Sequence, residues 1–317
     1  MRAVGDSSRH VEMTPSSDRA VKTALVAQVV YSSAKMYEVK GPDNLRDKGG
    51  DSMSSAEVTA GKLVADFGRT AADYGKHRAG FPPAFFDRLA AMQIVRPGVR
   101  SLDLGTGAGT LARGLAARGC ESTGLDRSTP LMEEAARIDR EAGISVRYVE
   151  APAEATGLPE ASFDLVIAGQ CWHWFDRPRA AAEARRLLKP GAHLVIAHFD
   201  WIPLPGNIAD LTEKLIEKHS PKWKLGGGMG MYPQWLGGVA TAGFRGIETF
   251  SFDLEVPYSH EAWRGRIRAS AGVGASLSAQ AVAAFDAELK SALAERFPED
   301  PFSVLHRVFA VIARAPE

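Results

Sequence analysis

The chain has 317 residues with 38 basic and 38 acidic side chains, so its formal net charge at neutral pH is zero. A balanced charge gives no general attraction to nucleic acid or to anionic membranes, and a polyanionic partner would need a local basic patch. Hydrophobic residues make up 45% of the chain, which is enough for one large packed domain. The composition therefore indicates a soluble globular protein and argues against nucleic-acid and membrane partners.

The first 52 residues mix serine, glycine and charged residues, and their one apolar run, at 24–30, is too short to cross a bilayer. We expect this segment to be disordered or extraneous, and leave open whether natural translation begins near Met53. The two cysteines, Cys120 and Cys171, lack metal-ligand spacing and fit a reducing compartment. The sequence thus predicts a cytoplasmic protein with two buried cysteines and no metal site.

Apolar strand-like runs alternate with amphipathic helical patterns from residue 99 onward. This rhythm predicts a mostly parallel sheet with helices on both faces, in which ligands bind beyond the carboxyl ends of the strands. The expected strands cover residues 99–104, 120–126, 144–149, 163–169, 192–199, 244–256 and 304–314.

The domain layout follows from composition. We expect an N-terminal helical cap at 53–98 and a ligand-binding core at 99–200. Residues 201–235 are rich in proline, glycine and tryptophan, which is typical of an inserted lid. The rest of the core, 236–317, is expected to carry a helical insertion at about 258–298.

The stretch LDLGTGAGT places Gly105, Gly107 and Gly109 directly after the first of these strands. Glycine lets backbone N–H groups approach a ligand, and the N-terminus of the helix that follows favours negative charge. The spacing is one residue short of the dinucleotide fingerprint, and the lysine of a P-loop is absent. Asp103 could meet a cationic ligand group or fix the loop through backbone N–H groups.

Asp126 ends the next expected strand. A carboxylate at this place can accept hydrogen bonds from both hydroxyls of a ribose. The alternative is a cap for the helix that starts at Pro130, but Ser128 and Thr129 are better placed for that cap. We therefore predict that Asp126 binds a ribose.

Four ordered motifs, LDLGTGAGT, GLDRS, APAEATGLPEASFDLVIAGQCWHWFD and RRLLKPGAHLVI, carry a resemblance to a known family. The chain resembles the class I S-adenosylmethionine-dependent methyltransferases, in the small-molecule branch that includes trans-aconitate methyltransferase-like and type 11 enzymes. The resemblance implies a Rossmann-like α/β fold with a mostly parallel seven-stranded sheet, a C-terminal antiparallel strand and a helical lid. It also implies S-adenosyl-L-methionine as cofactor and S-adenosyl-L-homocysteine as product.

In this family the glycine loop packs against the methionine part of the cofactor, and the segment after the third strand surrounds the adenine. Many relatives have Gly-Asp before the Ala-Glu pair of that segment, whereas this chain has Ala151 and Pro152. The adenine contact would then come from Ala153 or Glu154. Carried onto this chain, the resemblance implies cofactor contacts at Tyr74, Arg78, Asp103, Gly105, Thr106, Gly107, Asp126, Arg127, Ala153, Glu154, Gln170 and Trp172.

Tyr74 and Arg78 belong to a stretch, 67–82, that resembles the family's helix over the cofactor. Tyr74 could cover the sulfonium, and Arg78 could hold a carboxylate of cofactor or substrate. The alternative is a capping helix with solvated charges.

The stretch GQCWHWFD, at 169–176, follows the fourth expected strand. Two tryptophans around a histidine are unusual in a solvent loop because their apolar areas need cover. The resemblance implies that this run lines the cofactor and substrate pocket, with His173 and Trp174 toward the substrate. The Asn-Pro-Pro-Tyr type motif of nucleic-acid amino methyltransferases is absent here, which argues against bases as acceptors.

Methyl transfer from a sulfonium is a direct displacement, so alignment can supply most of the rate. A carboxylate acceptor is already ionised at neutral pH, while an ammonium or a phenol, with a pKa of about 10, must lose a proton. His173 could serve as the base for that step. The alternative is that His173 packs and hydrogen-bonds to orient the pocket.

Arg264 and Arg268 are four residues apart in WRGRIRAS and would share one helical face, with Trp263 adjacent. They could bind an anionic substrate, or form a solvated or ion-paired helix face. Together with aromatic residues of the expected lid they suggest an acceptor with an apolar body and an acid group. Those aromatic residues are Trp201, Trp223, Tyr232 and Trp235.

The sequence thus predicts a methyltransferase that modifies oxygen, including carboxylate oxygen, or nitrogen of a small organic molecule, as a monomer or homodimer. The alternative is a non-catalytic S-adenosylmethionine-binding or regulatory protein of the same fold. A nicotinamide oxidoreductase is disfavoured because the glycine spacing is wrong and the later motifs would have no explanation.

Overall fold

The chain divides into two units, Met1–Ser52 and Met53–Glu317. The computed structural model describes residues 58–60, 63–65 and 80–317, so the first unit, Tyr74 and Arg78 lie outside the described residues. The described part begins with an antiparallel pair of short strands, β1 (Val58–Ala60) and β2 (Leu63–Ala65).

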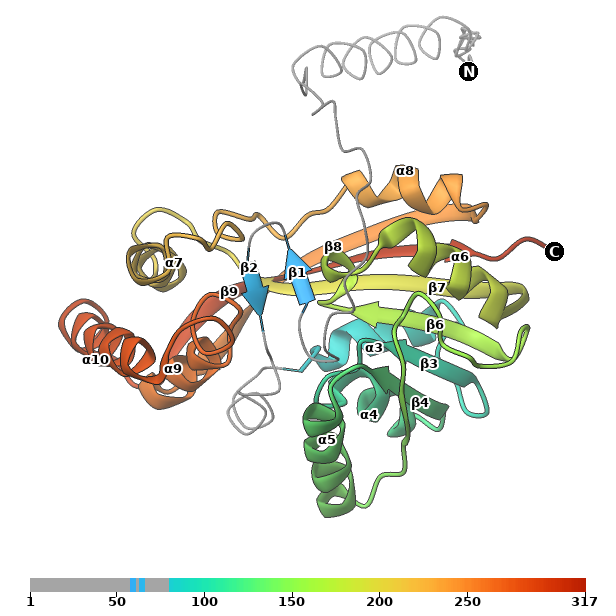
Figure 1. The fold of residues 1–317 in the computed structure, drawn as a ribbon, viewed down its shortest axis with the longest axis horizontal. Helices are drawn as coiled ribbons and strands as arrows, with labels where there is room; N and C mark the ends of the chain where they lie inside the picture. Colours follow the sequence, from blue (N-terminus) through green and yellow to red (C-terminus); the bar gives the residue numbers. More distant parts are fainter. Residues whose placement is uncertain (1–57, 61–62, 66–79) are drawn as a thin grey trace, which may run out of the picture. The chain divides into compact units, whose positions relative to one another are not determined.

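A seven-stranded sheet forms the centre of the second unit, in the order β5-β4-β3-β6-β7-β9-β8 (Figure 1). The strands from β5 to β7 run parallel, and β9 runs antiparallel to both β7 and β8. The predicted Rossmann-like sheet with its antiparallel C-terminal strand is confirmed. The strands are β3 (Arg100–Leu104), β4 (Glu121–Asp126), β5 (Arg147–Glu150), β6 (Phe163–Gly169), β7 (Leu188–Trp201), β8 (Arg245–Tyr258) and β9 (Phe302–Arg314).

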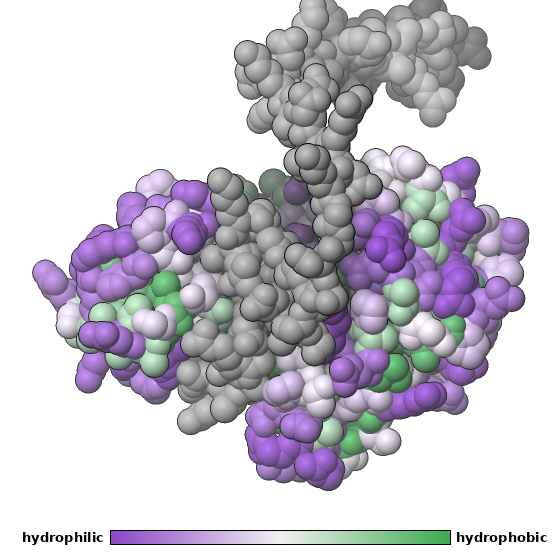
Figure 2. All heavy atoms as spheres, in the orientation of Figure 1, coloured by the Kyte–Doolittle hydropathy of each residue, from purple (hydrophilic) through white to green (hydrophobic). Residues whose placement is uncertain are grey.

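Helices cover both faces of this sheet. Each face has its own cluster of buried apolar side chains. The cluster on one face includes side chains of α3 and α4, and the cluster on the other face includes side chains of α6 and α8. Helix α5 lies beside α4 (Figure 1). The visible surface of α5 is largely hydrophilic (Figure 2), as expected of a helix that buries a single apolar stripe. These helices are α3 (Pro83–Ala91), α4 (Thr110–Ala116), α5 (Thr129–Ala142), α6 (Arg177–Leu187) and α8 (Gln234–Thr241).

Three further helices form what we call the helical lobe: α7 (Ile208–His219), α9 (His260–Arg268) and α10 (Ala279–Arg296). They share a third apolar cluster, which includes Trp263 and Phe285 and continues onto Tyr258 and Phe302 at the ends of β8 and β9. The lobe is therefore packed onto the end of the sheet by a core of its own. None of the helices in the described part of the chain has the length and hydrophobicity to cross a bilayer.

The strand β7 runs to Trp201, two residues beyond its expected end. Its last residues pair with β9, where Asp200 lies opposite Arg307 and Trp201 opposite His306. The segment expected to be an inserted lid, 201–235, contains α7, whose first turn is capped by the Asn207 side chain accepting the Asp210 N–H at 2.9 Å. These two features place the carboxyl end of β7 close to α7, and the Trp201 indole N–H donates a hydrogen bond to Glu213.

Candidate active site

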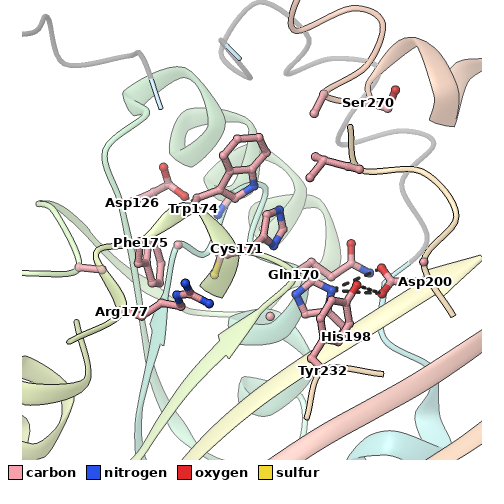
Figure 3. Close-up of a pocket in the computed structure, with 18 of the residues that line it drawn as sticks. Asp126, Gln170, Cys171, Trp174, Phe175, Arg177, His198, Asp200, Tyr232 and Ser270 are labelled. Carbon is pink, nitrogen blue, oxygen red and sulfur yellow. Dashed lines mark hydrogen bonds and ion pairs between the residues drawn. The ribbon is translucent and has the colours of Figure 1, made fainter. Parts of the chain in front are cut away.

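A cavity of about 520 Å³ opens beyond the carboxyl ends of β4, β6 and β7 (Figure 3). Its wall runs from Asp126 on β4, past Gln170 and Trp174 after β6, to His198 on β7 and Arg266 on α9. Open α/β sheets bind ligands in this crevice, next to the strand where the sheet order reverses, which here is β3. The volume is that of a small-molecule site.

Gly105 forms the turn between β3 and α4. Its φ of +68° is left-handed, and a Cβ atom there would lie 2.8 Å from Sγ of Cys171. Gly107, with a φ of +54°, follows in the same loop, and both glycines line the cavity. Packing of the loop against Cys171 therefore requires glycine at 105, independently of any ligand. Cys120 is buried as expected, but Cys171 is only partly buried.

Asp103 and Thr106 are buried behind the glycine loop and do not line the cavity. The Thr106 hydroxyl donates a 2.7 Å hydrogen bond to Asp103, and the Ala112 N–H in α4 donates one of 3.2 Å. Burial raises the pKa of Asp103 to about 7, although both hydrogen bonds act in the opposite direction. Of the two roles that the sequence left open for Asp103, the structure shows the fixing of the loop.

Asp126 lies at the cavity wall with both carboxylate oxygens engaged (Figure 3). They accept hydrogen bonds from the Gly107 N–H at 2.8 Å and the Ser128 N–H at 2.9 Å. Burial raises the pKa of Asp126, against the effect of these bonds and of the neighbouring Arg127. A carboxylate held in this way keeps further lone pairs for hydroxyl donors in the cavity.

Arg127, Ala153 and Glu154 also line the cavity, close to Asp126 in the fold. One oxygen of the Glu154 carboxylate accepts a 2.9 Å hydrogen bond from the Asp176 N–H. Glu154 therefore ties the segment after β5 to the segment after β6. The structure thus brings the glycine loop, Asp126 and the pair at 153–154 together in one wall.

The segment after β6 forms a 3-10 turn, η2 (Trp172–Trp174), that separates its two tryptophans. Trp174 and His173 line the cavity, as does Gln170, whose amide donates to the Phe199 carbonyl. Trp172 is instead buried in the apolar cluster under α6 and α8 and does not line the cavity. The predicted cofactor contact of Trp172 is therefore not supported, because a 3-10 turn points residues two apart in different directions.

His198 and Asp200 on β7 also line the cavity, and the sequence interpretation did not include them. Alternate residues of a strand share a face, so both side chains point the same way. Nδ1 of His198 lies 3.2 Å from Oδ2 of Asp200, and the same oxygen accepts a 2.6 Å hydrogen bond from the Tyr232 hydroxyl (Figure 3). Burial opposes ionisation of Asp200, but His198 and the Tyr232 hydroxyl together lower its pKa to about 2.

The helical lobe contributes Arg266 to the far end of the cavity. The Arg266 side chain is buried, and its guanidinium lies over the Trp201 ring, 5.0 Å from the centroid. The Trp201 indole N–H donates a 2.6 Å hydrogen bond to Glu213 of α7, whose other oxygen accepts the Gly227 N–H at 2.7 Å. Glu213 therefore fixes both the indole and the loop that follows α7.

Arg264 and Arg268 lie outside this cavity. Both bind Asp286 of α10, with Arg268 Nη1 2.9 Å from Oδ1, and both also contact Glu261. Trp263 is completely buried and donates a 3.0 Å hydrogen bond to Thr212. The helix presents the ion-paired face that the sequence had left as the alternative, and Arg266 is the arginine that faces the cavity.

Sequence comparison identifies the class of this domain. Residues 102–196 match the family described as "Methyltransferase domain". The chain is 36% identical over 144 residues to malonyl-[acyl-carrier protein] O-methyltransferase of Enterobacter lignolyticus, which covers 45% of this chain and 55% of that protein. It is 31% identical over 208 residues to a ubiquinone/menaquinone biosynthesis C-methyltransferase of Bordetella parapertussis, covering 63% and 66%.

A solved structure agrees with this result. A protein of Anaeromyxobacter dehalogenans, provisionally assigned as a type II methyltransferase, superposes with a TM-score of 0.53 at 26% identity, over 76% of this chain and 99% of that one. The chain spans about half the length of most of the curated relatives it matches. The fold and the family match together show that the chain carries a methyltransferase domain with a Rossmann-like sheet.

Proposed function

We propose that the chain binds S-adenosylmethionine at the Asp126 end of the cavity and transfers its methyl group to a small organic acceptor at the Arg266 end. The observation that carries this proposal is one continuous cavity whose two ends differ in chemistry. A glycine loop and a backbone-held carboxylate form one end, and aromatic rings with a buried arginine form the other.

The residues at the first end fit the cofactor. The lone pairs of Asp126 that face the cavity would accept hydrogen bonds from the ribose hydroxyls, and Gly105 and Gly107 leave the loop without side chains beside the amino-acid part. Ala153 and Glu154 would lie beside the adenine. The cofactor supplies an electrophilic methyl group: an electron pair of the acceptor forms the new bond to carbon, and sulfur keeps the pair of the bond that breaks.

The second end fits an acceptor with an apolar body and an acid group. The rings of Trp201 and Trp223 line it, and Arg266 offers a charged donor away from bulk water. Arg266 takes the role that the sequence had suggested for Arg264 and Arg268. The hydrogen bond from the Gly227 N–H to Glu213 holds the loop after α7 at this end of the cavity.

A transfer assay tests this proposal. The full chain is incubated with methyl-labelled S-adenosylmethionine and a panel of hydroxy- and amino-substituted aromatic acids, and products are identified by mass spectrometry. We expect a labelled product and an equal amount of S-adenosylhomocysteine. Cofactor binding without turnover of any acceptor would favour the non-catalytic alternative, and lack of cofactor binding would contradict both.

A further inference from the structure

His198 is held by its neighbours in one orientation at the acceptor end of the cavity. Its side chain is 3% exposed, and its ring lies 4.3 Å from the Tyr232 ring and 5.0 Å from the Trp235 ring, centroid to centroid. Nδ1 faces the Asp200 carboxylate at 3.2 Å. Three side chains thus fix both the position of the imidazole and the direction of one of its nitrogens.

The contact with Asp200 determines which nitrogen carries the proton. An ionised carboxylate only accepts hydrogen bonds, so Nδ1 is the N–H of the neutral ring and Nε2 holds the lone pair. Burial and the nearby Asp200 charge raise the pKa of Tyr232, so its hydroxyl stays protonated and keeps donating to Asp200. Nε2 is buried and has no hydrogen-bond partner in the described part of the chain, although His198 lines the cavity.

We propose that Nε2 of His198 receives the proton that the acceptor loses, and that the methylated atom is therefore a hydroxyl, amine or thiol rather than a carboxylate. This inference rests on the proposed function. The bond from the acceptor atom to hydrogen breaks as its bond to the methyl carbon forms, and the hydrogen leaves as a proton to Nε2. The positive charge that entered with the sulfonium ends on the imidazolium, beside the Asp200 carboxylate.

Two strands, β3 and β6, separate His198 from the proposed cofactor site. His198 lies on β7, three strands from Asp126 on β4, or about 14 Å at the usual strand spacing. His173, the histidine chosen from the sequence, lies between them on η2, with its ring 4.8 Å from the Trp174 ring and 5.3 Å from the His198 ring. The hydrogen bond of Asp200 goes to His198, so a proton gained there is stabilised directly. His173 is then a packing and orienting residue.

Nitrogen NMR of the protein without ligands tests the geometry. Long-range proton–nitrogen spectra of the labelled full chain report the tautomer of each histidine, and His198→Asn identifies the signals of His198. We expect a protonated Nδ1 and an unprotonated Nε2 near pH 8, with that preference lost in Asp200→Asn. A protonated Nε2 in the wild-type chain would overturn the proposal.

The chemistry of the product tests the role. Each compound of the aromatic acid panel offers a carboxylate and one hydroxyl or amino group, and alkali releases labelled methanol only from a methyl ester. We expect base-stable products, and a methyl ester would overturn the proposal. His198→Asn should lower kcat by about 10²- to 10⁴-fold. His198→Gln is a second variant from which the same loss is expected. Both variants should bind the cofactor with an affinity within twofold of the wild type.

A matched control separates this effect from loss of any histidine. His219 also contacts a carboxylate, with Nε2 2.8 Å from Glu288, but lies outside the cavity, so His219→Asn should keep full activity. If no panel compound reacts, the proposed function is in question, and the NMR tautomer alone decides for or against the proton acceptor.

Discussion

The Gly107 N–H donates a 2.8 Å hydrogen bond to the Asp126 carboxylate, which joins the glycine loop after β3 to the end of β4. Two motifs that are separate in the sequence thereby become parts of one surface. Two carboxylates hold the shape of the glycine loop: Asp126 accepts a hydrogen bond from the Gly107 N–H, and the buried Asp103 accepts one from the Thr106 hydroxyl. Changes in either carboxylate should therefore affect the loop as well as any direct ligand contact.

Gly105→Ala should destabilise the fold beyond the cost of its backbone conformation. Gly157 has nearly the same φ, +69°, but a Cβ atom there would meet nothing within 4 Å, whereas at Gly105 it would lie 2.8 Å from Cys171. Gly157→Ala should cost about 1–2 kcal/mol for the left-handed conformation, and Gly105→Ala about 1–3 kcal/mol more for overpacking. Urea unfolding of both variants measures the difference. Equal losses would show that Cys171 does not crowd this position.

Asp103 should make stability depend on pH between about pH 4 and 7. Burial raises its pKa in the folded chain to about 7 from the ordinary value of 3.8. The stability that Asp103 contributes in its protonated form is therefore fully present below pH 3.8 and is lost as the pH rises through 7. The free energy of unfolding of wild type minus that of Asp103→Asn should fall over this range, by the order of a few kcal/mol, and then stay level. A difference that does not change with pH would contradict the raised pKa.

Arg266→Met should weaken the binding of acceptors that carry an acid group. Loss of a charged hydrogen bond costs about 1.5–3 kcal/mol, so KM should rise roughly 10- to 150-fold. The KM for uncharged amide analogues of the same acceptors should be the same in Arg266→Met as in the wild type. Arg264→Met is the matched control, because Arg264 lies on the same helix but binds Asp286 outside the cavity. An equal rise of KM in both variants would contradict the role of Arg266.

The sheet could be predicted from the sequence because each strand is an apolar run between clear helix and turn signals. The end of β7 could not, since its last residues stay in the strand by pairing with β9, far away in the chain. That extension brings Asp200 beside His198, and neither residue belongs to a recognisable motif. The alternation of the two polar residues in the stretch AHFDW was the signal that could have indicated a shared face.

The orientation of α9 could not be predicted from the sequence either. Arg264, Arg266 and Arg268 are chemically equal candidates, and only the packing of the helical lobe decides which one faces the cavity. Trp263 is held in the lobe by its hydrogen bond to Thr212, which turns Arg264 and Arg268 toward Asp286. Asp126 was predictable because its place at the end of a parallel strand defines its position without any knowledge of the packing.

Calorimetric titration of the full chain with S-adenosylmethionine tests the central claim most directly. We expect one site in the wild type, and in Asp126→Ala a loss of about 1.5–3 kcal/mol, or roughly 10- to 150-fold in affinity. Asp164→Ala is the control, because Asp164 also accepts a backbone N–H, from Arg100 at 3.0 Å, but lies at the start of β6, at the end of the parallel strands opposite the cavity. Unchanged affinity in Asp126→Ala, or no binding by the wild type, would contradict the assignment of this cavity to the cofactor.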